Sequence, residues 1–261
     1  MTLLPFERHC AEIVVQTDLL RSHVAGADMA APVRSCPGWN LGQLLRHVGG
    51  DHRWAEEVVR TEATGPLAGG LVDDVSAYTH EDGAVLDGWL ADGAGTLAVT
   101  LRRAGPGRKV WTPADGQDTV GFWARRMLYE TVVHRADAAL ATGTRFTVKE
   151  ELAVDAVEEW LEFSTVPEAF ASRSEEPDVL GPGRTLHLDA DGAGRWRVDL
   201  TGTRPRWRRV PARDEAAVTV HAPVTDLLLC LYRRTALSVE IRGDRKLFDL
   251  WRRRAGFWLE A

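Results

Sequence analysis

The stretch LLRHVGGDHRWAEEVVR, residues 44–60, has the spacing of a helix with one buried face. Four of its residues share a single stripe: Leu44, His47, Trp54 and Val58. The imidazole of His47 is therefore expected to point into the protein together with apolar side chains. A buried imidazole needs a polar partner, which is either a hydrogen-bonding group in the core or a metal ion held with other ligands.

A second stretch, MLYETVVHRADA at residues 127–138, offers such ligands. Glu130 and His134 are four residues apart, so their side chains share one face of the predicted helix, on a mostly apolar stripe. Together with His47 they would form the ligand set of a catalytic zinc site or a related divalent site. Spacing alone leaves an alternative open: Glu130 and His134 form an ordinary ion pair, and His47 bonds to a carbonyl group.

The periodicity of the chain changes once. Helical patterns occur in residues 6–25, from Leu41 onward, and in residues 84–103, 120–141 and 149–163. The first four are typical of an antiparallel four-helix bundle. After about residue 175, RTLHLDA, GRWRVDL, RWRRV and AAVTVHA alternate with period two and predict an antiparallel sheet, followed by a helix, a strand and a closing helix. We expect a helical domain over 1–170 and an α+β domain over 175–261.

Composition excludes several classes of protein. The chain has 261 residues, 44% of them hydrophobic, and lacks both a membrane-length apolar run and an export signal. Its three cysteines, Cys10, Cys36 and Cys230, are far apart, which argues against a disulfide framework. We therefore expect a cytoplasmic protein with no membrane partner.

The charge balance argues against nucleic acid as a partner. The 32 basic and 38 acidic residues are interspersed and give a net charge of −6. Nearly all of the basic residues are arginines, which together with abundant Ala and Gly indicates a GC-rich bacterial genome.

Several motifs together resemble the mycothiol-dependent maleylpyruvate isomerase family of actinobacteria over nearly the whole chain. They are PGWNLGQLLRHV at 37–48, ETVVHRADA at 130–138, DLLLCLYRR at 226–234 and IRGD at 241–244. The resemblance implies a DinB-like four-helix bundle that holds a divalent metal, followed by a small sterol-carrier-like α+β domain. It also implies that His47, Glu130 and His134 are the metal ligands, with zinc as the expected metal.

Three further residues are candidates for catalytic work. Asp51 lies one turn after His47 and would orient a ligand or bind substrate. Arg126 lies one turn before Glu130 and would pair with it or with a substrate carboxylate. Arg234 ends the DLLLCLYRR motif, where the family carries an arginine suited to an anionic substrate. Each also has an ordinary alternative as a solvated or packing residue.

Neighbouring polar and aromatic residues are expected to support the site or the core. Asp137 matches the His-x-x-Asp pattern of the family and would hold a ligand in place or pack the helix. His52 lies well round the helix from His47 and is expected to be exposed. The tryptophans are expected to pack in the core: Trp39, Trp54 and Trp123.

These residues predict an enzyme that uses a thiol from solution. A divalent metal turns a thiol into a nucleophilic thiolate near neutral pH, and none of the three cysteines suits that role. The resemblance implies mycothiol, which would add to the cis double bond of maleylpyruvate, allow rotation and leave by elimination to give fumarylpyruvate. The alternatives are a mycothiol S-transferase acting on electrophiles and a non-catalytic small-ligand-binding protein. The expected partners are the thiol and a small substrate, for a monomer or homodimer.

Overall fold

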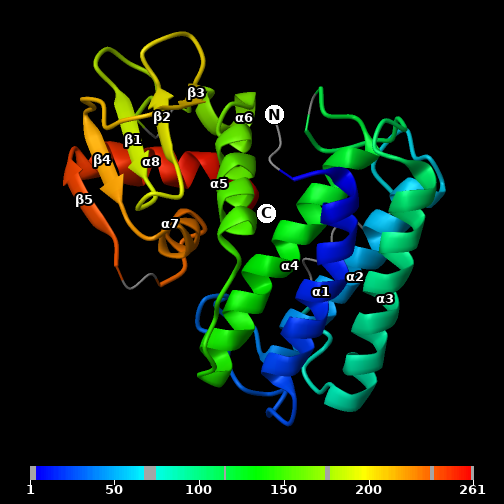
Figure 1. The fold of residues 1–261 in the computed structure, drawn as a ribbon. Helices are drawn as coiled ribbons and strands as arrows, with labels where there is room; N and C mark the ends of the chain where they lie inside the picture. The colour runs from blue at the N-terminus through cyan, green and yellow to red at the C-terminus, as the bar shows by residue number, and fades with distance from the viewer. Residues whose placement is uncertain (1–3, 68–74, 115, 174–176, 236–237, 260–261) are drawn as a thin grey trace. The chain divides into compact units, whose positions relative to one another are not determined.

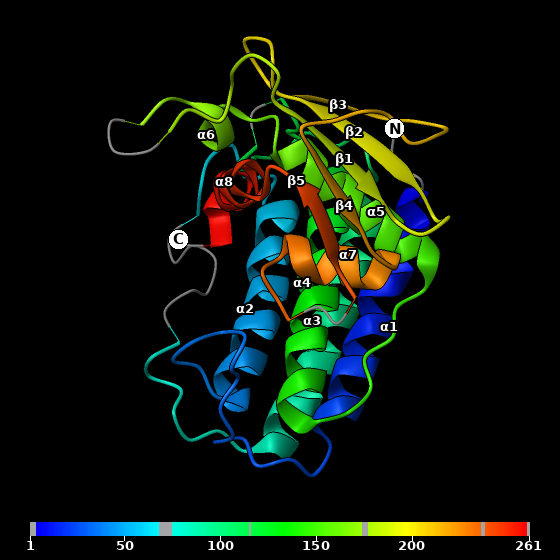
Figure 2. The same cartoon turned by 90° about the vertical axis from the view of Figure 1, so that its left-hand side faces the viewer.

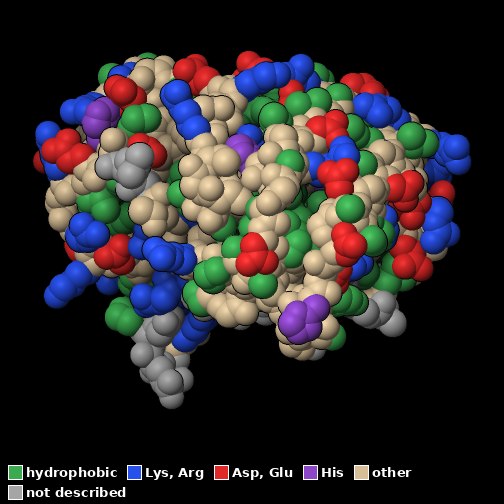
Figure 3. All heavy atoms as spheres, turned by 90° about the horizontal axis from the view of Figure 1, so that it is seen from below, with side chains coloured by type: hydrophobic (Ala, Val, Ile, Leu, Met, Phe, Trp, Pro, Cys, Tyr) green, Lys and Arg blue, Asp and Glu red, His purple; other side chains and the backbone are tan. Residues whose placement is uncertain are grey.

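The computed structural model describes residues 4–67, 75–114, 116–173, 177–235 and 238–259 (Figure 1). The chain divides into two compact units, Leu4–Thr147 and Val148–Ala261. None of the helices in the described ranges is long and apolar enough to cross a membrane. On the face drawn in Figure 3, Lys and Arg side chains are interspersed with Asp and Glu.

The first unit is a bundle of four long helices, as the sequence predicts. They are α1 (Phe6–Val24), α2 (Leu41–Arg60), α3 (Gly83–Ala104) and α4 (Val120–Thr142). Helix α1 packs against α3 and α4, and α2 packs against the same two helices (Figures 1 and 2). Helices α2 and α4, which carry the candidate metal ligands, are therefore neighbours in the bundle.

A capping box fixes the start of α2. The side chain of Asn40 accepts a hydrogen bond from the backbone N–H of Gln43 at 2.8 Å, and the Gln43 side chain accepts one from the Asn40 N–H at 2.9 Å. This exchange satisfies two backbone donors that would otherwise lack helical partners. It confirms Asn40 as the predicted N-cap and sets the helical phase that turns His47 inward.

Helix α3 approaches α2 closely at Gly49. A Cβ atom at this position would lie 2.2 Å from Cζ3 of Trp89, which no side chain can tolerate without movement. The Trp89 ring in turn lies under the guanidinium groups of Arg46 and Arg53, at 4.4 and 4.0 Å from its centroid. The cost of a glycine within the helix is thus offset by close packing between α2 and α3.

The second unit combines a five-stranded sheet with helices. Its helices are α5 (Glu150–Phe163), α6 (Pro167–Phe170), α7 (Val224–Leu231) and α8 (Arg245–Ala255), with a short 3-10 turn at Phe257–Leu259. Its strands are β1 (Thr185–Asp189), β2 (Arg195–Asp199), β3 (Arg206–Arg209), β4 (Val218–His221) and β5 (Glu240–Gly243), in the order β3-β2-β1-β4-β5.

One ladder of this sheet corrects the sequence prediction. The pairs β1–β2, β2–β3 and β4–β5 are antiparallel, but β1 and β4 are parallel, with Leu186 opposite Val218. The expectation of a wholly antiparallel sheet was therefore wrong. Two antiparallel pairings make β3 run in the same direction as β1, and the connection 210–217 then crosses to the far side of β1 and back to the starting end of the sheet, so β4 is parallel to β1.

Helix α5 packs within the second unit. The Trp196 indole on β2 donates a hydrogen bond to Glu158 at 2.9 Å, and Trp160 lies 4.9 Å from the ring of Tyr232. The expected domain boundary near 170–175 falls partly on residues 174–176, outside the described residues. The division into the domains 1–170 and 175–261 stays a prediction.

Candidate metal centre

Helices α2 and α4 bring the three predicted metal ligands together inside the bundle. One donor atom from each of His47, Glu130 and His134 lies within 4.8 Å of the other two. Nε2 of His134 is 2.9 Å from Glu130 Oε1, and Nε2 of His47 is 3.6 Å from the same oxygen. The two imidazole rings meet edge to face, with their centroids 4.8 Å apart. Two nitrogens and one oxygen thus converge on a single region.

This region is almost closed to solvent. His47 is 5% exposed and His134 is 6% exposed. Polar groups in such a place are costly unless they bond to one another or to an ion. Three converging donors of this chemistry suit a divalent cation of the zinc type and leave a further coordination position open.

Arg126 holds the carboxylate of Glu130 from the opposite side. Its Nη2 donates to Glu130 Oε2 at 2.5 Å, which leaves Oε1 directed at the two histidines. Burial raises the pKa of Glu130, but the charge of Arg126, the hydrogen bond with His134 and the approach of His47 to 3.6 Å outweigh it. The pKa is therefore held well below its ordinary value, and Glu130 is an anion, the form that binds a metal.

The two histidines have the opposite tendency. Burial lowers the pKa of His134, but its bonds to Asp137, Cys36 and Glu130 raise that pKa well above the ordinary value. Burial also lowers the pKa of His47, and the charge of Asp51 with the bond to Glu130 brings it above the ordinary value. Without a metal the site therefore attracts protons, and a metal would have to displace them.

Two buried aspartates flank these histidines. Oδ2 of Asp51 is 3.3 Å from His47 Nε2, and Oδ2 of Asp137 accepts a hydrogen bond from His134 Nδ1 at 2.9 Å. Asp51 is 1% exposed and Asp137 is fully buried. In a neutral His134 ring, the bond to Asp137 leaves the Nε2 lone pair on the side of His47 and Glu130.

The environment of His52 corrects the sequence prediction of an exposed residue. His52 is 1% exposed, and its Nε2 lies 2.8 Å from the hydroxyl of Thr131 on α4. Helix α2 packs against both α3 and α4, so it buries two faces rather than the single one that its apolar stripe indicated. Burial lowers the pKa of His52 to about 3, which leaves the ring neutral.

The tryptophans divide into two groups. Trp54 and Trp123 pack edge to face in the core at 5.3 Å, as predicted. Trp39 is half-buried; it packs against the bundle core as predicted, and its ring lies 4.9 Å from that of His47. A cavity of about 450 Å³ opens beside Trp39, and Arg34 and Gln43 also line it. Space for a small molecule therefore adjoins the ring that covers His47.

Cys36 is the residue that sequence reasoning missed. Its Sγ lies 3.4 Å from Asp137 Oδ2, so a thiol of the chain itself stands next to the candidate centre. The sequence motifs exclude Cys36 because it precedes PGWN rather than lying on either ligand helix. Its position four residues before the N-cap Asn40 was the available signal.

The third catalytic candidate, Arg234, lies in the second unit. It is half-buried and donates from Nη1 to the carbonyl oxygen of Tyr232 at 2.8 Å. Its part in the site stays a prediction.

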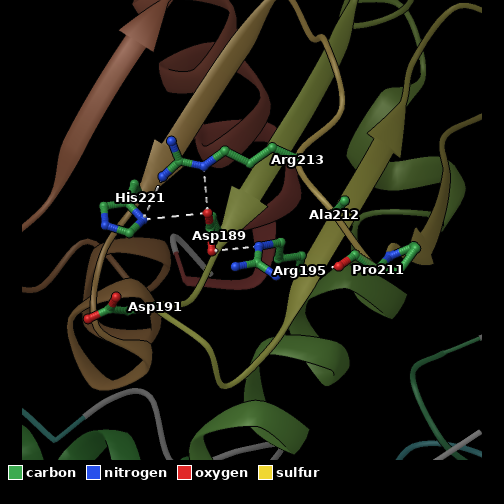
Figure 4. Close-up of a pocket in the computed structure, with 7 residues that line it drawn as sticks. All are labelled: Asp189, Asp191, Arg195, Pro211, Ala212, Arg213 and His221. Carbon is green, nitrogen blue, oxygen red and sulfur yellow. Dashed lines mark hydrogen bonds and ion pairs between the residues drawn. The ribbon is translucent and has the colours of Figure 1, made fainter.

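The same unit contains a cavity of about 400 Å³ beside Asp189 (Figure 4). Arg195 and Arg213 approach the two carboxylate oxygens of Asp189 at 3.1 and 2.8 Å, and His221 lies 3.7 Å from one of them. Four of the side chains that line this cavity thus contact one another: Asp189, Arg195, Arg213 and His221.

Comparisons with known proteins agree with this architecture. A family model described as the mycothiol maleylpyruvate isomerase N-terminal domain matches residues 10–139, and the corresponding C-terminal domain model matches residues 151–250. No curated protein matches the chain.

Solved structures show the same fold. A crystal structure of the mycothiol-dependent maleylpyruvate isomerase aligns with a TM-score of 0.63 and 15% identity, covering 91% of this chain and 93% of that one. A histidine-to-alanine mutant of that isomerase aligns over the same shares with a TM-score of 0.61 and 14% identity. The two domain models together span most of the chain, which therefore belongs to the mycothiol maleylpyruvate isomerase family.

Proposed function

We propose that this protein is a metal-dependent and mycothiol-dependent cis–trans isomerase of the maleylpyruvate isomerase type. The observation that carries the proposal is the convergence of His47, Glu130 and His134 in the bundle, with one donor atom of each within 4.8 Å of the others. Membership in the family supports the choice of thiol and substrate class.

These three residues would hold one divalent ion, with zinc as the expected metal. Imidazole nitrogen and carboxylate oxygen are ordinary zinc ligands, and a three-residue set is typical of catalytic rather than structural zinc sites. When bound, the metal supplies the positive charge that keeps an incoming thiol ionised.

The surrounding residues orient the metal ligands and accept the proton of the thiol. Arg126 keeps Glu130 anionic and turned toward the histidines, and Asp137 fixes the orientation of the His134 ring. Asp51 borders the site at 3.3 Å from His47 Nε2 and is the proposed acceptor of the thiol proton. Arg234 is proposed to bind a substrate carboxylate, as the family resemblance implies.

The reaction needs no oxidant or reductant. In the chemistry that the family implies, a C–S bond would form between the thiol sulfur and one carbon of the cis double bond, and the π electrons would move onto the activated neighbouring carbon. The former double bond would then be single and could rotate. Return of the electron pair would re-form the double bond in the trans geometry, the C–S bond would break, and the thiol would be regenerated.

Zinc-loaded protein incubated with mycothiol and maleylpyruvate tests the proposal. We expect loss of the cis isomer without accumulation of a thiol adduct, no reaction without thiol, and slower reaction with glutathione. The His47→Ala variant serves as the metal-site control and is expected to be inactive.

The other outcomes assign the other functions. A stable adduct without isomerisation would identify a thiol S-transferase. No reaction with this or other electrophiles, together with an apolar ligand retained on purification, would identify a binding protein and contradict the isomerase proposal.

A further inference from the structure

The His134 ring has metal-binding groups at both of its nitrogens. On the Nε2 side stand Glu130 and His47, the ligands already assigned. On the Nδ1 side, Asp137 Oδ2 lies at 2.9 Å, and Cys36 Sγ lies 3.4 Å from that oxygen. The donor atoms of Cys36, His134 and Asp137 all lie within 4.8 Å of one another. The ring thus separates two sets of three donors that share only His134.

The chemistry of the second set differs from that of the first. It offers one sulfur, one nitrogen and one oxygen, a combination that suits zinc and favours softer ions over hard ones. Ligand atoms around a tetrahedral ion with bonds of about 2.0–2.3 Å lie roughly 3.3–3.8 Å apart. The Sγ–Oδ2 distance of 3.4 Å falls in that range, whereas Nδ1 and Oδ2, now 2.9 Å apart, would separate by about 0.4 Å on binding.

The protein holds these donors in place without help from an ion. The turn that carries Cys36 is closed by hydrogen bonds from the Cys36 N–H to Val33 O at 3.0 Å and from the Trp39 N–H to Cys36 O at 3.1 Å. Asp137 and His134 are buried on α4, whereas Cys36 is only half-buried. An ion from solution would therefore meet the sulfur first.

We propose that Cys36, His134 and Asp137 form a second metal-binding position, which takes thiophilic divalent ions such as Cd²⁺. On binding, the Cys36 thiol releases its proton to solvent and its sulfur bonds to the ion, with no change in oxidation state.

Occupancy of this position would empty the first one. A neutral imidazole has one lone pair, so a metal on Nδ1 leaves Nε2 protonated and donating to Glu130. His134 can then no longer bind a metal together with His47. This second consequence rests on the metal site of the proposed function, whereas the second position itself does not.

Cadmium titration of four proteins tests the inference: wild type, Cys36→Ser, His47→Ala and Cys230→Ser. The readout is the ultraviolet charge-transfer absorption of a cadmium–thiolate bond. We expect the band at one equivalent in wild type, in His47→Ala and in the control Cys230→Ser, which loses a thiol remote in sequence. We expect no band in Cys36→Ser. The Asp137→Asn variant, which keeps the side-chain shape, is expected to need at least about tenfold more cadmium.

A band that persists in Cys36→Ser, or is absent from wild type, would overturn the second position. Zinc-loaded wild type is expected to release one zinc for each cadmium bound; if both ions remain bound, the exclusion between the positions is wrong. Failure of the proposed function gives a different result: in a Cys36→Ser background, which lacks a ligand of the second position, His47→Ala would then keep its zinc whatever the cadmium band does.

Discussion

The bundle and the sheet each hold a largely enclosed carboxylate among basic groups, and the two carboxylates, Glu130 and Asp189, differ in what their oxygens contact. Asp189 in the sheet has a guanidinium on each oxygen, from Arg195 at 3.1 Å and Arg213 at 2.8 Å. Among the residues that the structure describes, Glu130 in the bundle has a guanidinium on one oxygen only, while the other oxygen faces two imidazoles. A fully paired carboxylate stabilises the fold, whereas a half-paired one keeps an oxygen available for a metal.

The histidines of the two regions follow the same contrast. The side chain of His221 is 34% exposed and contacts Asp189, which is already paired with two arginines. His47 and His134 are buried, and both face an oxygen that has no guanidinium on it. Beside the Glu130 anion these imidazoles hold either protons or a metal ion, and each of these supplies the compensating positive charge.

Removal of the Glu130 charge should have the largest effect. Glu130→Gln keeps the side-chain shape but removes the anionic ligand, so we expect thiol-dependent turnover to fall by at least about 100-fold, because loss of a residue that merely supports a ligand already costs 10–100-fold. Steady-state kinetics with saturating zinc measure this. His221→Ala is the matched control from the sheet cavity and should stay within about twofold of wild type. Equal losses of turnover in Glu130→Gln and His221→Ala would contradict the assignment of catalysis to the bundle rather than to the sheet cavity.

The pH dependence of metal binding should be steep in the bundle. The pKa values of His47 and His134 stand above the ordinary value of 6.5 in the metal-free protein, so protons compete with the metal for both rings. Zinc affinity should rise by up to about tenfold per pH unit for each protonated ring, and should level off once the pH exceeds both raised pKa values. Chelator competition at a series of pH values measures the slope.

The stability of the metal-free protein should change with pH in the opposite direction. A raised histidine pKa contributes stability below the unfolded value, and that contribution is lost as the pH rises through the folded value. Thermal unfolding with and without zinc should therefore diverge as the pH increases. If the unfolding temperature changed with pH in the same way with and without zinc, the histidines would not be metal ligands.

Loss of the Arg126 side chain should lower the zinc affinity more than it lowers the stability of the fold. Arg126→Ala frees Glu130 Oε2 and lets the carboxylate rotate, so we expect zinc affinity to fall by about 10–100-fold. Calorimetric titration with zinc measures it. Arg46→Ala, on α2 but bonded to Glu81 instead, should bind zinc as tightly as wild type.

The smallest effect should come from the paired carboxylate of the sheet. Asp189→Asn leaves two guanidinium groups without their counter-charge, but the Arg213 side chain is 56% exposed, so water screens part of the loss. We expect the free energy of unfolding to fall by about 1–2 kcal/mol, with zinc content unchanged. Urea denaturation together with metal analysis measures both. Loss of zinc in this variant would contradict the structural role of Asp189.

Much of the fold follows from periodicity, and its exceptions have physical causes. The stripe through His47 and the four-residue spacing of Glu130 and His134 predict which side chains face the bundle interior. The same stripe misplaces His52, because a single sequence does not show that α4 presents Thr131 to another face of α2. Alternation likewise predicts the strands but not that connection 210–217 makes β4 parallel to β1.

The candidate site shows the same division between local and long-range information. Asp137 follows His134 by one helical turn, so its contact with that ring was foreseeable from the sequence. Cys36 lies 101 residues from Asp137, and only the closure of the turn before α2 brings its sulfur to that carboxylate. Contacts within one helix are encoded in spacing, whereas contacts between a loop and a helix depend on tertiary packing.

The most direct test of the metal assignment is the zinc stoichiometry of Cys36→Ser, Cys36→Ser/His47→Ala and Cys36→Ser/His221→Ala after zinc loading and exhaustive dialysis, because Cys36→Ser removes a ligand of the second position. The account predicts one zinc per chain in Cys36→Ser and in Cys36→Ser/His221→Ala, and none in Cys36→Ser/His47→Ala, with all three proteins folded by circular dichroism. Full zinc occupancy in Cys36→Ser/His47→Ala, or its loss in Cys36→Ser/His221→Ala, would contradict the assignment of the metal to the bundle.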